Sequence, residues 1–271
     1  MVTINFKISY QNGDADDHRL DMYDAALSLQ GFAKALSITT HALLNNGEIR
    51  KTGNRVEGAK IFINPSKKGS FEELITIVVN NPEATIGVSV LSSAFWDLVK
   101  WTWSKTLELP YSPQTPHVKK LNNKLEPFIG EMEEALEIPL EQAHRPIKQC
   151  DDMIISLTRP RTGEVIRMDI ETLKSVSLQT ESKLIEGIIG NVTKYNIISG
   201  IGRFYDDSIA HTISFKIKDN LSLNQREMLT WSMHHAQNGN GGKVVLKIKR
   251  VMSAKGVVKR YLVHDVKIAN S

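Results

Sequence analysis

The last third of the chain, residues 187–271, constrains the fold most strongly. Alternation of apolar and polar residues there predicts three strands, then a helix, then two more strands. These elements are expected at 188–198, 203–205, 211–218, 224–237, 243–251 and 257–268. Turn-forming glycine, asparagine, aspartate and serine residues separate them. The order predicts a small β-rich domain in this part of the chain.

The same segment carries the surplus positive charge of the protein. Residues 187–271 hold 13 Lys and Arg against 5 Asp and Glu, a net charge of +8, whereas residues 1–186 hold 21 against 25, a net charge of −4. Such a difference between two parts of one chain indicates an anionic partner for the basic part. It does not identify the partner.

Five strands with a helix between the third and the fourth resemble the OB-fold, a small, partly open barrel. The resemblance covers residues 187–271 and depends on the order and spacing of elements, without a sharp motif. It implies a barrel that binds oligonucleotides, oligosaccharides or proteins. An SH3-like barrel fits the same order almost as well, so both architectures stay open.

The part before the barrel reads as an α+β domain. A strand at 2–10, a helix at 22–45 and strands at 58–64 and 71–79 predict a sheet with helices on one face. A helical region of about 84–149 follows, with one helix at 84–107 and a pair at 117–138 and 140–149. A hairpin at 153–158 and 164–169 and a short helix at 171–177 complete it. We therefore expect two domains, 1–182 and 183–271.

Two stretches of this first domain, LDMYDAALSLQGFAKAL and NPSKKGSFEELI, are similar to segments of uncharacterised bacterial proteins from phage-defence or mobile-element neighbourhoods. The resemblance carries no known catalytic residue with it. It implies a place in antiviral defence, and this function is an expectation for the chain.

Basic and aromatic residues of the predicted barrel are the first candidate site. Lysine and arginine neutralise phosphates, and aromatic rings stack on bases. The candidates for binding nucleic acid are Lys194, Arg203, Phe204, Tyr205, Lys216, Lys218, Lys247, Lys249, Lys255, Lys259 and Arg260. Alternating lysines equally suit the solvated outer face of a strand, so this reading stays open beside the first.

An acidic loop before the first helix is the second candidate. His18 with Asp16 or Asp21 is the acid–base pair that an enzyme would use here. The ordinary reading is that Asp21 caps the helix and Asp24 lies in its first turn. No established metal-binding loop matches the spacing, and we expect neither a metal nor a cofactor.

An aromatic helix is the third candidate. Phe95, Trp96, Trp101 and Trp103 suit either a core or an interface with a partner, including a second copy of the chain. Asp97 and Lys100 lie inside the same apolar stretch, so we expect no membrane span.

The single cysteine, Cys150, excludes an internal disulfide and a multi-cysteine zinc site, and it fits a reducing cytoplasm. The sequence favours a non-enzymatic binding or adaptor protein whose barrel engages nucleic acid. A protein-interaction scaffold without nucleic acid and an enzyme that uses the Asp16, His18 and Asp21 region are the alternatives.

Overall fold

A computed structural model of the chain describes residues 1–52, 55–64, 71–80, 87–122, 128–177, 179–218, 221–239 and 241–269. The chain divides into two compact units, Met1–Ser177 and Leu178–Ser271. The expected boundary at 182 lies a few residues after this division. The fold is α+β with a small closed barrel of five strands in the second unit, as the sequence predicts.

The first unit is built on a five-stranded antiparallel sheet in the order β2-β3-β1-β4-β5. Its strands are β1 (Val2–Gln11), β2 (Ala59–Asn64), β3 (Glu72–Val79), β4 (Ile154–Arg159) and β5 (Gly163–Met168). The alternation along β1 holds, because Ile4, Phe6 and Ile8 are buried on one face. The expected strands at 2–10, 58–64 and 71–79 and the expected hairpin are all present.

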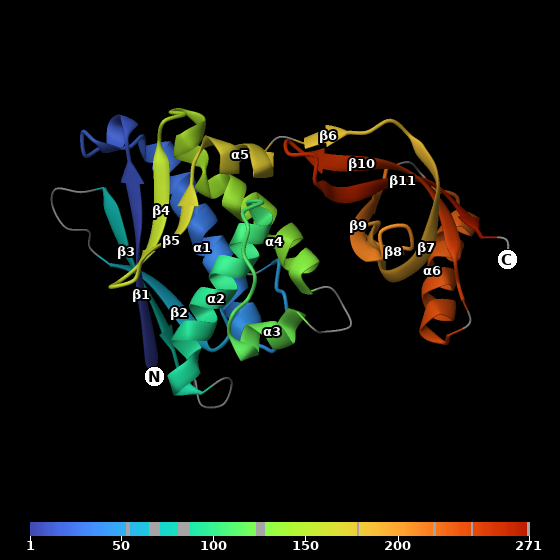
Figure 1. Cartoon of the computed structure of the whole chain (residues 1–271), viewed down its shortest axis with the longest axis horizontal. Coiled ribbons are helices and arrows are strands. Elements are labelled where there is room, and N and C mark those ends of the chain that lie inside the picture. The colour runs from blue at the N-terminus through green and yellow to red at the C-terminus, as the bar shows by residue number, and fades with distance from the viewer. Residues whose placement is uncertain are drawn as a thin grey trace. The chain divides into compact units, whose positions relative to one another are not determined.

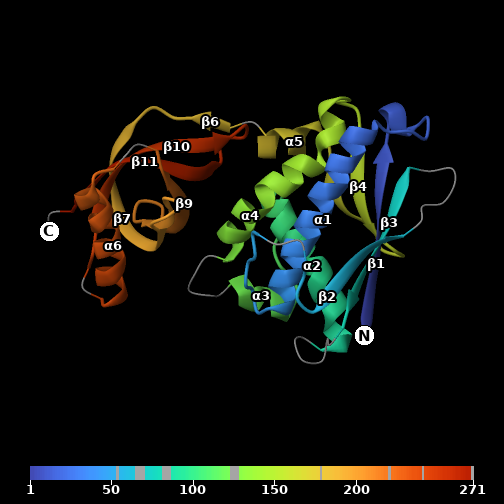
Figure 2. The same cartoon turned by 180° about the vertical axis from the view of Figure 1, so that it is seen from behind.

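Helices cover the buried face of this sheet, and the other face carries no layer of described residues (Figure 1, Figure 2). The helical elements are α1 (Met22–Leu44), α2 (Val88–Thr106), α3 (Pro116–Asn122), α4 (Phe128–Ala143) and α5 (Ile170–Ser177), with short 3-10 turns at Gly13–Ala15 and Arg145–Lys148. Asp21 caps α1 by accepting hydrogen bonds from the backbone N–H groups of Tyr23 and Asp24. The first part of the expected helix 84–107, residues 84–86, lies outside the described residues.

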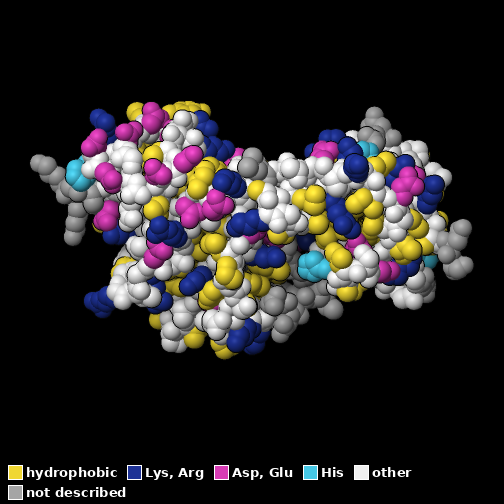
Figure 3. Space-filling view, turned by 45° about the horizontal axis from the view of Figure 1, so that its top comes forward, with side chains coloured by type: hydrophobic (Ala, Val, Ile, Leu, Met, Phe, Trp, Pro, Cys, Tyr) yellow, Lys and Arg dark blue, Asp and Glu magenta, His cyan; other side chains and the backbone are white. Residues whose placement is uncertain are grey.

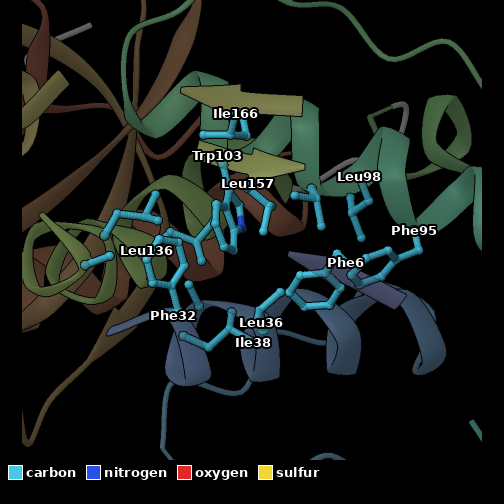
Figure 4. Close-up of a cluster of buried hydrophobic side chains, with 14 of the residues drawn as sticks. Phe6, Phe32, Leu36, Ile38, Phe95, Leu98, Trp103, Leu136, Leu157 and Ile166 are labelled. Atoms are coloured by element: carbon cyan, nitrogen blue, oxygen red, sulfur yellow. The ribbon is translucent and has the colours of Figure 1, made fainter. Parts of the chain in front are cut away.

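The aromatic residues of α2 are core residues, so the expected interface at Phe95, Trp96, Trp101 and Trp103 is wrong. Each of the four side chains is at most 5% exposed. Their rings face two different layers: Trp96 meets Phe6 of β1 at 5.8 Å between ring centroids, and Trp101 meets Phe128 of α4 at 5.9 Å. Figure 4 shows Phe95 and Trp103 among the other buried side chains of this core, with Phe95 beside Phe6. Since α2 is covered from both the sheet and α4, aromatic rings on several of its sides are buried.

The expected helix pair at 117–138 and 140–149 differs from the structure. Helix α3 and the start of α4 lie in the first expected range, of which residues 123–127 fall outside the described residues. Helix α4 continues through Pro139 to Ala143 instead of ending before the proline. Helix α1 packs closely on this stretch at Gly31, where an added Cβ would lie 2.5 Å from the Pro139 carbonyl oxygen. The Ser28 hydroxyl also donates to the Ala143 carbonyl at 2.7 Å. Tertiary packing therefore holds a helical turn that the local preference of proline disfavours.

The second unit is a closed five-stranded barrel in the order β7-β8-β9-β11-β10, with β10 pairing back to β7. Its elements are β6 (Gln179–Glu181), β7 (Ile185–Asn196), β8 (Ile201–Asp206), β9 (His211–Ile217), α6 (Leu223–Gln237), β10 (Val244–Ser253) and β11 (Val258–Ile268). Strands β9 and β11 are parallel, and the other barrel pairs are antiparallel. The predicted order of three strands, a helix and two strands is confirmed. The short strand β6, which extends the sheet beyond β10, was not expected.

Two glycines let the barrel strands approach one another. An added Cβ at Gly190 would overlap the Tyr205 carbonyl oxygen and the Phe204 ring. At Gly202 it would overlap the Phe215 ring and the Lys194 carbonyl oxygen. Aromatic rings inside the barrel thus lie directly over glycine backbone, which allows β7 and β8 to bend around a narrow core.

Candidate nucleic-acid interface on the barrel

Strand register brings three of the predicted basic residues into one row across the barrel wall. Lys194 of β7 lies opposite Arg203 of β8, Arg203 lies opposite Ser214 of β9, and Ser214 lies beside Arg260 of β11. We call Lys194, Arg203, Ser214 and Arg260 the basic row. It crosses three spacings between neighbouring strands, about 14 Å. Lys194 is exposed and Arg260 is half-buried, whereas Arg203 is only 4% and Ser214 9% exposed. Lys194 and Arg260 therefore supply the accessible positive charge of the row.

Residues on either side of the basic row extend the face. Lys216 is exposed on β9 opposite Ile201 of β8, and among the described residues it has no ion-pair partner. Tyr205 of β8 lies on the other side of the row, opposite Thr212, with 37% of its surface exposed. In Figure 3, Lys and Arg side chains on the visible face of the barrel alternate with hydrophobic ones and do not form one continuous patch. The face is thus mixed, with a basic line and apolar or aromatic neighbours.

Three of the predicted lysines form ion pairs with Glu181 or Glu186. Lys247 lies 2.6 Å from Glu186, and Glu181 lies 3.2 Å from Lys249 and 3.8 Å from Lys218. The side-chain hydrogen bond from Lys249, together with the nearby charge of Lys218, lowers the pKa of Glu181. Glu181 belongs to β6 and Glu186 to the start of β7. These two carboxylates of the chain itself therefore neutralise part of the positive charge of Lys218, Lys247 and Lys249. Ion pairs as exposed as these contribute little to stability.

The remaining candidates for binding nucleic acid are Lys255, Lys259 and Phe204. They lie in a turn, in a strand and in the barrel core. Lys255 is exposed in the turn between β10 and β11, and Lys259 lies in β11, where its carbonyl oxygen accepts a hydrogen bond from Ser214 at 3.4 Å. Phe204 is 0% exposed and belongs to the barrel core, so its expected stacking on a base is wrong. The reason is strand alternation: Phe204 points into the barrel, while Arg203 and Tyr205 lie on the other side of β8, where Arg203 is buried and Tyr205 is exposed.

A buried polar cluster forms around Asp206, the last residue of β8. The carboxylate of Asp206 accepts hydrogen bonds from the Tyr261 hydroxyl at 2.7 Å and from the Ser208 hydroxyl at 2.6 Å. Burial, followed by the hydrogen bond to Asp206, raises the pKa of Tyr261 well above its usual value, so the phenol stays protonated. The positive charge of Arg250 opposes this rise. The cluster is hydrogen-bonded within the barrel and plays a structural part.

The acidic loop does not assemble an acid–base pair among the residues that the structure describes. Asp16 accepts a hydrogen bond from the Asn12 backbone N–H at 2.9 Å, and Asp21 is occupied in capping α1. His18 is exposed, has a positive φ of 57°, and is hydrogen-bonded to neither carboxylate. Each carboxylate thus serves its own backbone turn, which is the ordinary reading of the loop.

Comparison with protein families gives two matches that follow the division into units. A domain of unknown function, DUF7946, matches residues 6–177, and a family of unknown function, DUF7947, matches residues 185–267. The chain belongs to the DUF7946 family. The DUF7946 region is the sheet and its helices, and the DUF7947 region is the barrel. No curated protein and no solved structure matches the chain, and the relation to phage-defence or mobile-element proteins stays a prediction.

Across the described parts of the chain, no group of three or more histidine, cysteine, aspartate or glutamate residues is arranged to hold a metal ion. None of the described helices combines the length and the apolarity that a bilayer-spanning helix needs.

Sequence reasoning missed Ser214 as a member of the basic row, because a lone serine in a strand carries no signal until the register is known.

Proposed function

We propose that the protein is a non-enzymatic binding or adaptor protein whose barrel holds single-stranded nucleic acid on the outer face of β7, β8, β9 and β11. The observation that supports this proposal is the basic row, in which Lys194 is exposed and Arg260 half-buried, flanked by exposed Lys216 and Tyr205. Cations that follow a strand face neutralise phosphates, while an exposed ring offers a sequence-tolerant surface for a base. Binding with little sequence preference is therefore expected.

The connectivity of the barrel also supports the proposal. A closed order β7-β8-β9-β11-β10, with parallel β9 and β11 and a helix between the third and fourth strands, is the arrangement we associate with an OB-type barrel. Barrels of that type bind oligonucleotides, oligosaccharides or proteins, so the connectivity alone does not choose a ligand. Because the outer face is basic, it favours the oligonucleotide, which is the polyanion among these three ligands.

The first experiment is to purify the protein in low and then in high salt, and to compare the absorbance at 260 and 280 nm. Co-purifying nucleic acid that high salt removes is the expected result, since phosphate contacts weaken as salt rises. Fluorescence anisotropy with a labelled single-stranded oligothymidine then gives the affinity and its salt dependence. Binding that does not change with salt would contradict an interface made by the basic row.

A matched pair of variants locates the interface. Lys194→Glu with Lys216→Glu places two negative charges on the proposed face and should weaken oligothymidine binding by about tenfold or more. Lys243→Glu with Lys267→Glu makes the same change of net charge at lysines that lie beside Asp207 and Asp265. This control should change the affinity by less than about threefold. Equal losses in the two variants would show that net charge alone is being measured.

A protein-docking role without nucleic acid is the second candidate, and one observation favours it. A groove of about 910 Å³ lies between α1 and the edge strand β2, lined in part by Leu29, Ala33 and Ile61. Ile63 is on the helix-covered side of the sheet but remains 57% exposed. Two results together would favour this role. The protein would purify at low salt without nucleic acid, and light scattering would give a dimer mass that Ile63→Asp converts to a monomer mass.

A further inference from the structure

The turn between β7 and β8 presents two isoleucines to solvent. Ile197 is 62% exposed and Ile198 is 98% exposed, and Ile201 beside them is partly exposed. Single exposed apolar side chains are common on protein surfaces, but three in one place indicate a contact surface. We call Ile197, Ile198 and Ile201 the isoleucine tip.

The turn holds its shape through its own hydrogen bonds. The side-chain oxygen of Asn196 accepts from the backbone N–H groups of Ile198 at 2.9 Å and Ser199 at 3.1 Å. Gly200, with φ of 66°, donates its N–H to the Asn196 carbonyl at 2.9 Å and accepts from the Ile217 N–H at 2.9 Å. A turn tied to β9 in this way keeps the isoleucines in solvent instead of letting them fold back onto the barrel.

Two lysines lie near the isoleucine tip. Lys216 lies opposite Ile201 in the strand register, and Lys194 precedes the turn by two residues. Apolar side chains bordered by lysines suit a ligand that is anionic on one side and apolar on the other. A nucleic-acid strand has this chemistry, since its phosphates are charged and the faces of its bases are apolar.

We propose that the isoleucine tip contacts the bases of the strand whose phosphates the basic row holds. This inference depends on the proposed function, and it adds a second kind of contact to the same face. The basic row explains the part of the affinity that any polyanion would share. The isoleucine tip explains an additional affinity for strands that carry bases. The two contributions are separable, because a sugar–phosphate strand without bases keeps only the first.

The test compares two probes with the full chain: single-stranded oligothymidine and an abasic oligomer of the same length. Wild type should bind both and prefer the base-containing strand. Ile197→Ser with Ile198→Ser should leave the affinity for the abasic oligomer unchanged and lower the affinity for oligothymidine by about tenfold. Ile189→Ser with Ile209→Ser, which changes two other exposed isoleucines of the barrel, is the matched control and should change neither affinity.

The other outcomes separate a failure of the proposed function from a failure of this inference. Failure of wild type to bind either probe would overturn the proposed function. Binding of the two probes with equal affinity, or a preference that survives the Ile197 and Ile198 substitutions, would overturn the inference and leave the basic row standing. If those substitutions instead abolish binding to vesicles of anionic phospholipid without changing the preference for bases, the tip is a lipid contact and the inference is wrong.

Discussion

The hydroxyl of Tyr261 on β11 donates a hydrogen bond of 2.7 Å to the carboxylate of Asp206 on β8, although these strands are not neighbours in the barrel. Both side chains are almost completely buried. The bond therefore crosses the barrel interior over β9 and joins two walls that no ladder of backbone hydrogen bonds connects. A buried carboxylate that loses a donor pays for its desolvation without compensation.

Tyr261→Phe is expected to lower the free energy of unfolding by about 1–3 kcal/mol, because it leaves Asp206 with fewer donors. Urea unfolding followed by circular dichroism measures the change. Tyr205→Phe removes the same hydroxyl from an exposed tyrosine and should change stability by less than about 0.5 kcal/mol. Equal effects of the two substitutions would show that the bond across the barrel contributes nothing measurable.

Gly202→Ala is expected to disrupt the barrel by crowding and not by backbone strain. The added methyl would overlap the Phe215 ring and the Lys194 carbonyl oxygen, and a loss of about 2–3 kcal/mol or failure to fold should result. Gly187 provides the contrast, because it has φ of 82° and no atom within 4 Å of an added Cβ. Gly187→Ala should cost about 1–2 kcal/mol through its backbone conformation alone. A Gly202→Ala protein as stable as wild type would refute the crowding argument.

His144 is expected to make the stability of the first unit depend on pH. Its ring is fully buried, with Nδ1 2.6 Å from the Leu140 carbonyl oxygen and Nε2 2.9 Å from the Thr172 hydroxyl. Burial lowers the pKa of His144 from 6.5 to about 4. Between these two values the unfolded chain binds a proton that the folded chain does not bind, so stability falls as the pH falls.

This contribution is fully present above pH 6.5, is lost progressively as the pH falls to about 4, and is constant below that. It amounts to about 3 kcal/mol over the whole window. Urea unfolding at a series of pH values measures it, and an NMR titration of His144 in the wild type tests the pKa without a substitution. His211→Gln, at an exposed histidine of β9, should leave the pH dependence of the first unit unchanged. A His144 pKa near 6.5 would contradict the prediction.

Removal of two carboxylates is expected to strengthen binding to oligothymidine. Glu181 and Glu186 lie beside Lys249, Lys218 and Lys247, so they compete with phosphates for these lysines. Glu181→Gln with Glu186→Gln should raise the affinity a few fold and increase the salt slope by about 1 for each phosphate gained. Glu164→Gln with Glu171→Gln, in the first unit, is the control for net charge. An unchanged salt slope would show that these lysines touch no phosphate.

The sequence by itself determined the elements and their order. Alternation along β1 and the barrel strands, the cap at Asp21 and the turn residues between strands are local signals, since they follow from the backbone geometry of consecutive residues. The same alternation places Arg203 and Tyr205 on one side of β8 and Phe204 on the other, so it argues against the expected stacking of Phe204 on a base. That error was one of interpretation, because the signal was present.

Only the tertiary structure decided which residues meet. Lys194, Arg203 and Arg260 are distant in sequence, and the register of β7, β8, β9 and β11 aligns them. In the same way, the aromatic rings of α2 lie in the core because the sheet and α4 cover this helix from two sides. Pro139 lies inside a helix because α1 packs against that turn at Gly31. Local patterns depend on neighbours along the chain, whereas register and layer packing depend on contacts between segments that the sequence order keeps apart.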